Sequence, residues 1–433
     1  MGSQEYCIYR VPSPLREVKP EAYTPRMVII GPLHHSVKPR AYNHDIEANM
    51  LMEDLKNSNS SYLEYLMMEG QKKRYKEAFI KRIGQISVDE MKRTIQANIE
   101  KIRGSYAVPT SWISSPDFVD LILGDSIFIL ELSLRHWDKK HKTSQPSTSI
   151  GTACRDLTVD KTFFTSTVIE DLILLENQLP YFILEELFDP IKRDLCGNDD
   201  LTLYQLILNL FSKVGKIKEN TKFMHFTDMH RCVYEESLDQ NPDMKGTKGK
   251  THTQNAENLS HVGVEFKVWK DEYSLDVAFK EGCLTMPSFP ADENSDIILR
   301  NVIAYEQCHM LGNALTSEYI YLMNFLVTSD KDVEVLDARG LIANGIGRSS
   351  LVVKMINELG VGVRLPESTV YHGIAMKLRA HCKSRRKRFL AKLGNVYYSD
   401  CLTGTATTAA VILLFLTMVA TGASLYQAIM TQP

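Results

Sequence analysis

The sequence has no Cys-X-X-Cys pair, although eight cysteines are scattered along its 433 residues. Zinc sites of the ribbon or finger kind need such paired ligands, so we expect no bound metal. Basic residues are not in excess, since 50 Lys and Arg stand against 53 Asp and Glu, which argues against a nucleic-acid partner. The first residues lack the apolar stretch of a secretory signal. Motifs of kinases, zinc proteases and serine hydrolases are missing too, and we expect no cofactor.

Charge is also missing from the end of the chain. No charged side chain occurs from Cys401 to Pro433, and residues 377–399 hold eight basic side chains but no acidic one. The uncharged stretch Leu402–Tyr426 predicts a transmembrane helix, because a helix of that length rises about 37 Å; the alternative is a buried core helix. The predicted membrane-flanking basic residues are Lys383, Arg385, Arg386, Lys387, Arg388 and Lys392.

This charge pattern predicts a location as well as a helix. By the positive-inside rule, the N-terminal bulk of a single-pass, tail-anchored membrane protein would be cytosolic. The lipid bilayer would then be a partner through Leu402 to Tyr426, and we favour the plasma membrane over the endoplasmic reticulum. With a cytosolic body, the cysteines are expected to be reduced thiols.

The remainder of the chain predicts one large α-rich domain with a minor antiparallel β element, a mainly α (α+β) class. Helical spacing of apolar residues dominates, while Val262–Val268 and Leu275–Phe279 alternate as strands do. The predicted parts are a Pro-rich extended arm packing on the body (1–40), a helical part (41–234), a mobile polar insertion (235–260), a small β element (261–290), a helical part ending in the basic run (291–400) and the transmembrane helix (402–426).

Two polar clusters interrupt apolar helices and are the candidate sites. A carboxylate beside two amides is compatible with acid/base chemistry, but it equally suits a buried network that closes the exposed carbonyls of a helix end. Because no nucleophile or His is close in sequence, we favour the structural interpretation and predict no catalytic residue. The members of the clusters are Glu176, Asn177, Gln178, Arg300, Asn301, Glu306 and Gln307.

Three further local patterns carry weaker signals. His34 and His35 are adjacent, so on an extended arm they point to opposite faces and do not suit one metal. Gly345–Ser349 resembles a phosphate-binding loop, but no Lys follows it and no strand is predicted before it, so we expect a turn linking two helices. Ser87–Glu90 reads as a capping box that opens a helix.

Seven short strings follow one another along nearly the whole chain: Tyr9–Pro12, Ala22–Pro25, Ile30–His35, Ile102–Tyr106, Asp171–Pro180, Gly263–Phe266 and Arg300–Gln307. Taken together and in this order, they resemble the plant family named for domain of unknown function 247, also called uncharacterised protein family 0481. The resemblance implies an α-rich plant protein with a C-terminal membrane helix and no established catalytic activity. One grass branch of the family is associated with self-incompatibility loci.

The leading hypothesis is therefore a non-enzymatic, tail-anchored protein whose cytosolic domain binds an unknown protein partner. A self-incompatibility determinant is a special case of this hypothesis. The alternative is a membrane-tethered enzyme that uses Glu176, Glu306 or His309. A pocket in which these groups converge with strongly shifted pKa values would favour the enzyme, and a dry interior with paired acids would favour the binding protein.

Overall fold

The computed structural model describes the chain from Tyr6 to Met430 with gaps. Within the described part the fold is mainly helical with a few short strands, as the sequence predicts. Part of the predicted insertion 235–260, namely 237, 239–246 and 250–251, lies outside the described residues. So do Arg385, Arg386, Lys387, Arg388 and Lys392 of the basic run. The described residues are 6–35, 60–141, 162–196, 201–211, 221–236, 238, 247–249, 252–269, 274–384 and 401–430.

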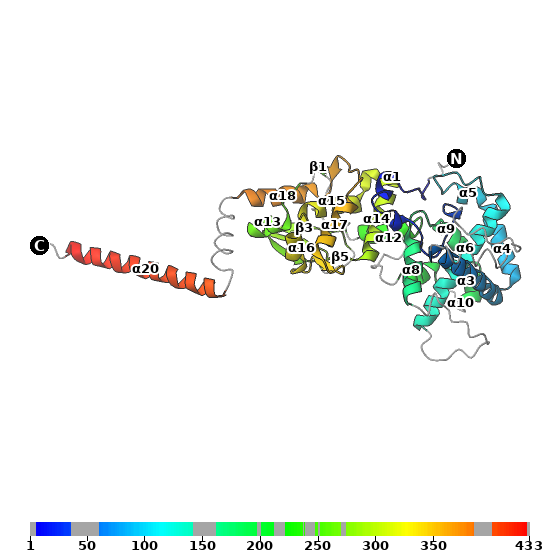
Figure 1. Ribbon diagram of the computed structural model, residues 1–433, viewed down its shortest axis with the longest axis horizontal. Helices are drawn as coiled ribbons and strands as arrows, with labels where there is room; N and C mark the ends of the chain where they lie inside the picture. Colours follow the sequence, from blue (N-terminus) through cyan, green and yellow to red (C-terminus); the bar gives the residue numbers. More distant parts are fainter. Residues whose placement is uncertain are drawn as a thin grey trace.

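The first hydrophobic core surrounds α6, Ser115–His141. The centre of this helix, Ile127–Leu130, is wholly buried, because it is apolar on every side and α3, α4 and α11 pack around it (Figure 1). The other helices of this half are α3 Ser60–Ile83, α4 Gln85–Ala97, α5 Ile99–Arg103, α8 Thr162–Ile173, α9 Tyr181–Phe188, α10 Lys192–Cys196, α11 Leu203–Leu210 and α12 Phe226–Glu236.

A second core fills the C-terminal half, where helices pack with short strands. It gathers apolar side chains such as Leu284, Ile320 and Ile356, none of which is accessible to solvent. Its helices are α13 Ala256–His261, α14 Glu293–His309, η4 Leu311–Asn313, α15 Leu315–Leu326, α16 Asp330–Asp337, α17 Ser349–Leu359 and α18 His372–Lys383. Its strands are β1 Thr247–Lys248, β2 Glu265–Val268, β3 Ala278–Lys280, β4 Cys283–Met286, β5 Phe289–Ala291, β6 Ile342–Asn344 and β7 Ser368–Thr369.

The N-terminal arm joins the two halves. Its described residues, 6–35, contain only the short helices α1, Ser13–Arg16, and η1, Pro20–Tyr23. A third, smaller core packs arm residues such as Val11 and Tyr23 against the α8–α9 turn and against α14. The arm is therefore an integral part of the interior between the two larger cores.

The strand pairing differs from the antiparallel prediction. The three-stranded sheet has the order β2-β4-β3, in which β3 and β4 are antiparallel but β2 runs parallel to β4. The pair β5 and β6 is parallel as well, while β1 and β7 are antiparallel. Alternation of apolar residues identifies a strand but carries no information about which strand lies beside it, and this explains the error.

Two local predictions are also wrong. Helix α4 begins at Gln85, after Gly84, so Ser87 lies inside the helix and its hydroxyl donates to the carbonyl of Ile83 at 2.9 Å. A strand does precede the loop at Gly345, because β6 ends at Asn344. That strand is only three residues long, too short for its alternation to be visible in the sequence.

The predicted membrane-spanning helix over Leu402–Tyr426 is wrong. A helix does form there, α20, Cys401–Met430, and Figure 1 shows it apart from the other helices. In the described part of the chain, no helix combines the length and the apolarity needed to cross a membrane. The helix contains the apolar run Val411–Leu416 together with six Thr and two Gly.

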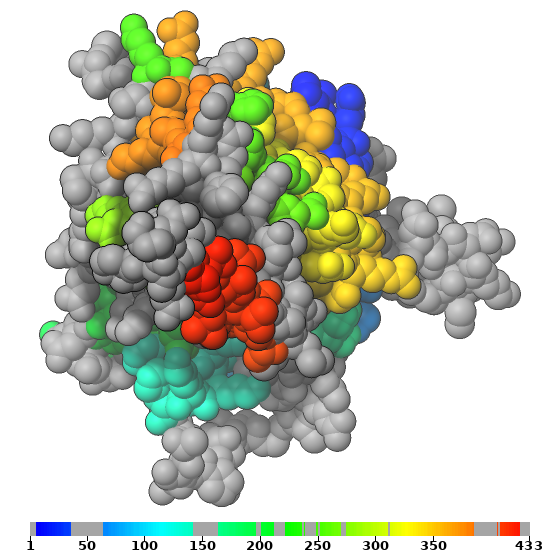
Figure 2. Space-filling model, turned by 90° about the vertical axis from the view of Figure 1, so that its left-hand side faces the viewer, coloured from blue at the N-terminus to red at the C-terminus, as the bar shows by residue number. Residues whose placement is uncertain are grey.

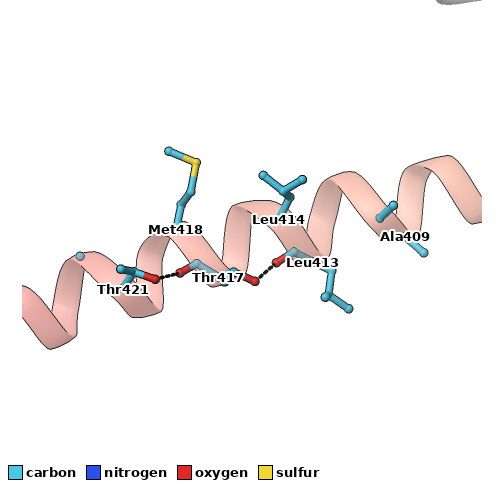
Figure 3. Close-up of a pocket in the computed structure, with 8 residues that line it drawn as sticks. Ala409, Leu413, Leu414, Thr417, Met418 and Thr421 are labelled. Carbon is cyan, nitrogen blue, oxygen red and sulfur yellow. Dashed lines mark hydrogen bonds between the residues drawn. The ribbon is translucent and has the colours of Figure 1, made fainter.

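Three hydroxyl groups of α20, those of Thr417, Thr421 and Ser424, donate to carbonyls of the helix itself. Thr417 donates its hydroxyl to the carbonyl of Leu413, and Thr421 donates to that of Thr417 (Figure 3). The predicted single-pass localisation, with the bulk of the chain on the cytosolic side of the plasma membrane, depended on a spanning helix and is overturned with it.

Candidate functional site

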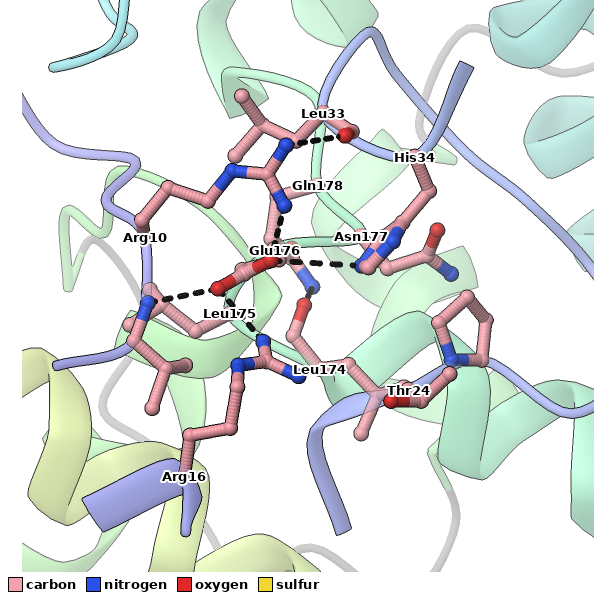
Figure 4. Close-up of polar contacts among 12 residues, drawn as sticks. Arg10, Arg16, Thr24, Leu33, His34, Leu174, Leu175, Glu176, Asn177 and Gln178 are labelled. Carbon is pink, nitrogen blue, oxygen red and sulfur yellow. Dashed lines mark hydrogen bonds and ion pairs between the residues drawn. The ribbon is translucent and has the colours of Figure 1, made fainter. Parts of the chain in front are cut away.

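The first polar cluster lies in the turn between α8 and α9, against the arm. Glu176, Asn177 and Gln178 are each at most 2% exposed. Figure 4 shows their side chains surrounded by residues of the arm, which is far away in sequence. We call this arrangement the arm clasp: the side chains of residues 176–178 together with the arm groups that contact them.

Glu176 is the charged centre of the arm clasp. Its carboxylate accepts hydrogen bonds from Arg10 Nη1 at 2.7 Å and from the backbone N–H of Val11 at 2.7 Å (Figure 4). Arg16 Nη2 lies 2.6 Å from Oε1, the oxygen that also accepts from Val11, whereas Arg10 contacts Oε2. Two guanidinium groups and a backbone donor therefore compensate the desolvation of this buried charge.

His34 is a further neighbour of the Glu176 carboxylate, but its ring carries no charge. Its Nε2 lies 3.6 Å from Glu176, and burial lowers the pKa of His34 to about 4. The ring is therefore neutral at pH 7. The adjacent His35 instead contacts the ring of Trp112 edge to face, so the two histidines do not converge. The described residues contain no group of three His, Cys, Asp or Glu side chains placed to hold a metal ion.

Asn177 holds the arm through its main chain. Its Oδ1 accepts from the N–H of Ile30 at 2.7 Å, and its Nδ2 donates to the carbonyl of Val28 at 2.9 Å and to that of Asp171 at 2.8 Å. A single amide thus bonds to the backbone in the manner of a neighbouring β-strand. The arm has no regular partner strand among the described residues there, and Asn177 takes that place.

Gln178 closes the end of α8. Its Nε2 donates to the carbonyls of Leu172 and Leu174 at 2.6 and 2.8 Å, and its Oε1 accepts from the N–H of Phe226 at 3.0 Å. The last carbonyls of a helix lack partners within the helix, so this amide satisfies them inside the protein. It also fixes the start of α12 against the turn.

Two further acids, Asp171 and Asp125, also bind the arm, although they are not among the residues predicted from the sequence. Asp171 accepts from three consecutive backbone N–H groups, those of residues 26–28, at 2.7–2.8 Å. Asp125 accepts from the N–H of Gly31 at 2.8 Å and pairs with the buried Lys72 at 2.6 Å. One feature of the sequence could have identified such an acid. It is a carboxylate within an apolar stretch of a helix, as at Asp125 in the middle of α6.

The second polar cluster lies on α14. Arg300 pairs with Asp296 at 2.9 Å, and Asn301 accepts from the N–H of Leu175 at 2.9 Å while donating to the carbonyl of Ala22 at 2.9 Å. Asn301 therefore ties α14 to both the arm and the α8–α9 turn.

The remaining two members of that cluster organise the segments after α14. Glu306 is wholly buried and accepts from the backbone N–H groups of Thr316 and Ser317, both at 2.8 Å, at the start of α15. Gln307 forms a pair of bonds with the backbone of Arg364, one accepted at 2.8 Å and one donated at 3.0 Å. Both side chains thus replace missing backbone partners.

The residues of the enzyme hypothesis do not share their partners. Glu176 bonds to the arm, Glu306 bonds to the start of α15, and His309 Nδ1 lies 2.9 Å from the hydroxyl of Tyr9. Each carboxylate accepts hydrogen bonds from the chain itself. The arrangement is suited to holding segments in place.

Buried acids in these clusters give the fold a pH dependence that can be measured. Burial raises the pKa of Glu306 to about 7 and that of Asp171 to about 7. A raised pKa in the folded state means that the stabilisation is complete below the unfolded pKa of ~4 and is lost as the pH rises through 7. We therefore expect the free energy of unfolding in urea to fall between pH 5 and pH 8, by on the order of 3 kcal/mol per group.

Urea unfolding of Glu306→Gln at the same pH values is the control. The variant has no titrating carboxyl at this position, so its free energy of unfolding should depend less on pH than that of the unchanged protein. An identical slope for both proteins would show that Glu306 does not titrate in this range.

A groove lies beside the arm, at the surface of the C-terminal half. It has a volume of about 320 Å³ and opens between the arm, the start of α14 and α17. Figure 2 shows the blue arm bordering the yellow and orange surface of that half. The lining residues are Val18, Lys19, Glu21, Asp292, Glu293, Asp296, Arg300, Ile346, Leu351, Lys354, Met355 and Glu358.

Comparison with known proteins gives one family and two relatives. A family model described as a plant protein of unknown function, DUF247, matches residues 8–416. The UPF0481 protein At3g47200 of Arabidopsis thaliana is 22% identical over 443 residues, which cover 96% of this chain and 86% of the relative. The putative UPF0481 protein At3g02645 of the same plant is 27% identical over 161 residues, covering 37% of this chain and 30% of the relative. No solved structure matches.

Proposed function

This chain belongs to the DUF247 family of plant proteins of unknown function, and from its surface we propose that it is a non-enzymatic protein-interaction module. The groove between the arm and α17 is the observation that carries the proposal. It is open to solvent and combines apolar side chains with charged groups of both signs. Protein-binding surfaces have this composition, with an apolar centre and a polar rim.

The apolar part of the groove contains one side chain that is clearly available for contact. Leu351, in the first turn of α17, is 42% exposed, whereas Met355, one turn further, is only 6% exposed and forms the floor. Ile346 and Val18 contribute the partly buried walls. A partner side chain in this position would bury Leu351 without moving the backbone.

The buried acids support the non-enzymatic part of the proposal. Glu176 and Glu306 are saturated with hydrogen bonds from the chain's own backbone and side chains. A general acid or base must exchange a proton with a substrate within hydrogen-bond reach. A carboxylate that holds a helix start or an arm performs a structural task instead.

A photo-crosslinking experiment tests the groove as a binding surface. A crosslinking amino acid placed at Leu351 in the full-length protein in plant cells should form adducts with a discrete partner. The same amino acid at Ile86, which is 75% exposed on α4, is the matched control and should not. Equal adducts at the two positions, or none at Leu351, would rule out the groove.

The identified partner then allows a quantitative prediction. Leu351→Gln should weaken its affinity at least about tenfold, because the loss of one buried Leu contact costs roughly 1.5–3 kcal/mol and about 1.4 kcal/mol is a factor of ten. Gln is a good helix former, so α17 should remain intact. Ile86→Gln should leave the dissociation constant unchanged, as measured by isothermal titration calorimetry.

A further inference from the structure

We infer that the occupant of the groove is a basic, partly apolar peptide segment of a partner protein. This inference rests on the proposed function and specifies the chemistry of the partner. The distribution of charge around the groove carries it, because the apolar floor alone is compatible with many protein segments.

The lining of the groove carries a net negative charge. Five carboxylates face three cationic groups, which leaves a formal charge of −2. The carboxylates are Glu21, Asp292, Glu293, Asp296 and Glu358, and the cationic groups are Lys19, Arg300 and Lys354.

The three cationic groups form ion pairs with two of the five carboxylates, Asp296 and Glu358. Asp296 lies 2.8 Å from Lys19 Nζ and 2.9 Å from Arg300 Nε. Glu358 lies 3.5 Å from Arg300 Nη2 and 3.7 Å from Lys354 Nζ. The other three carboxylates, Glu21, Asp292 and Glu293, make no ion pair with a cation of the lining within the described structure. They lie on η1 and at the start of α14, which contact each other, and we call this part of the groove the acidic end.

That acidic end is formed by η1 and by the start of α14. Glu293 is 78% exposed, and its ion pair with Arg26 Nη1 is long, at 3.9 Å. Asp292 precedes α14, where its Oδ1 accepts from the N–H of Ser295, and it lines the groove as well. Glu21 is exposed on η1.

The helix dipole reduces this charge only in part. The N-terminus of α14 contributes about half a positive charge, against three carboxylates. The acidic end should therefore attract Lys or Arg side chains at moderate ionic strength, where the Debye length is about 8–10 Å. A segment with an apolar residue over Leu351 and basic residues toward Glu21 and Glu293 matches both ends of the groove.

Selection from a random peptide display library tests the inference on the full-length protein. The enriched peptides should carry a net positive charge and at least one large apolar residue. A selected peptide should bind Leu351→Gln at least tenfold more weakly. It should also bind the double variant Glu21→Lys with Glu293→Lys at least tenfold more weakly at low salt.

A charge-matched control separates local from general electrostatics. Glu77→Lys with Glu90→Lys makes the same change of net charge on exposed positions of α3 and α4, far from the groove in the fold. Peptide affinity should change less than threefold in this variant. Thermal melts of all variants establish that each is folded before binding is compared.

The outcomes distinguish the two proposals. Peptides that need Leu351 but show no basic bias, or that tolerate the reversal at Glu21 and Glu293, would overturn the basic occupant and leave the groove as a binding site. A selection that yields no peptide sensitive to Leu351→Gln would overturn both. Equal losses in the groove reversal and in the Glu77 and Glu90 control would also overturn the basic occupant.

Discussion

Replacement of Asn177 by Leu is expected to lower the free energy of unfolding by at least about 3 kcal/mol. The change removes three hydrogen bonds and leaves the N–H of Ile30 and the carbonyls of Val28 and Asp171 buried without that partner. Each such group costs about 1–3 kcal/mol. Since a typical total stability is about 5–15 kcal/mol, urea unfolding should show a large shift of the midpoint or a protein that no longer accumulates.

Asn209→Leu is the matched control for this experiment. Asn209 is a half-buried residue of α11 whose Oδ1 accepts no hydrogen bond within the described structure. The same change of side chain should therefore alter the free energy of unfolding by less than about 1 kcal/mol. An Asn177→Leu protein that unfolds normally, but has lost a measurable activity, would contradict the structural role and favour the enzyme hypothesis.

Gly31→Ala should be nearly as damaging, although it adds one methyl group. Gly31 has a φ of +69°, and a Cβ built there would lie 2.5 Å from the carbonyl oxygen of Gln178. The left-handed backbone costs Ala about 1–2 kcal/mol, and relief of the clash requires a shift of arm or turn that costs about 1–3 kcal/mol more. The expected loss in urea unfolding is about 2–5 kcal/mol, the sum of these two costs.

Gly347→Ala isolates the contribution of the backbone in that prediction. Gly347 has a φ of +87°, but among the described residues no atom beyond its chain neighbours lies within 4 Å of the position that a Cβ would take. Its substitution should cost only the backbone term of about 1–2 kcal/mol. Equal losses at Gly31 and Gly347 would show that close approach to Gln178 does not constrain the arm.

The polar clusters can be predicted from the sequence, but the segment that they hold cannot. A polar triplet between two apolar helices, as at residues 176–178, indicates a helix end that needs partners, and Gln178 does bond to the last carbonyls of α8. The role of Asp171 and Asp125 depends on the arm folding back over more than 90 residues of chain. No local pattern encodes such a distance.

The C-terminal error has a different origin. Leu402–Tyr426 is long and carries no charged side chain, and these two properties predict a spanning helix. A helix does form over this stretch, but no helix in the described part of the chain is long and apolar enough to cross a membrane. Absence of charge and presence of sufficient apolar surface are separate requirements for a spanning helix.

The clasped arm also constrains the order in which the protein acquires its structure. The arm is synthesised first, yet its contacts reach Asn301 and His309, and the Tyr9–His309 bond spans 300 residues. At about 5–20 residues per second, the ribosome needs roughly 15–60 s to produce those partners. Throughout that interval the arm side chains that pack against α14, such as Tyr23, lack their final site, so this part of the fold forms late.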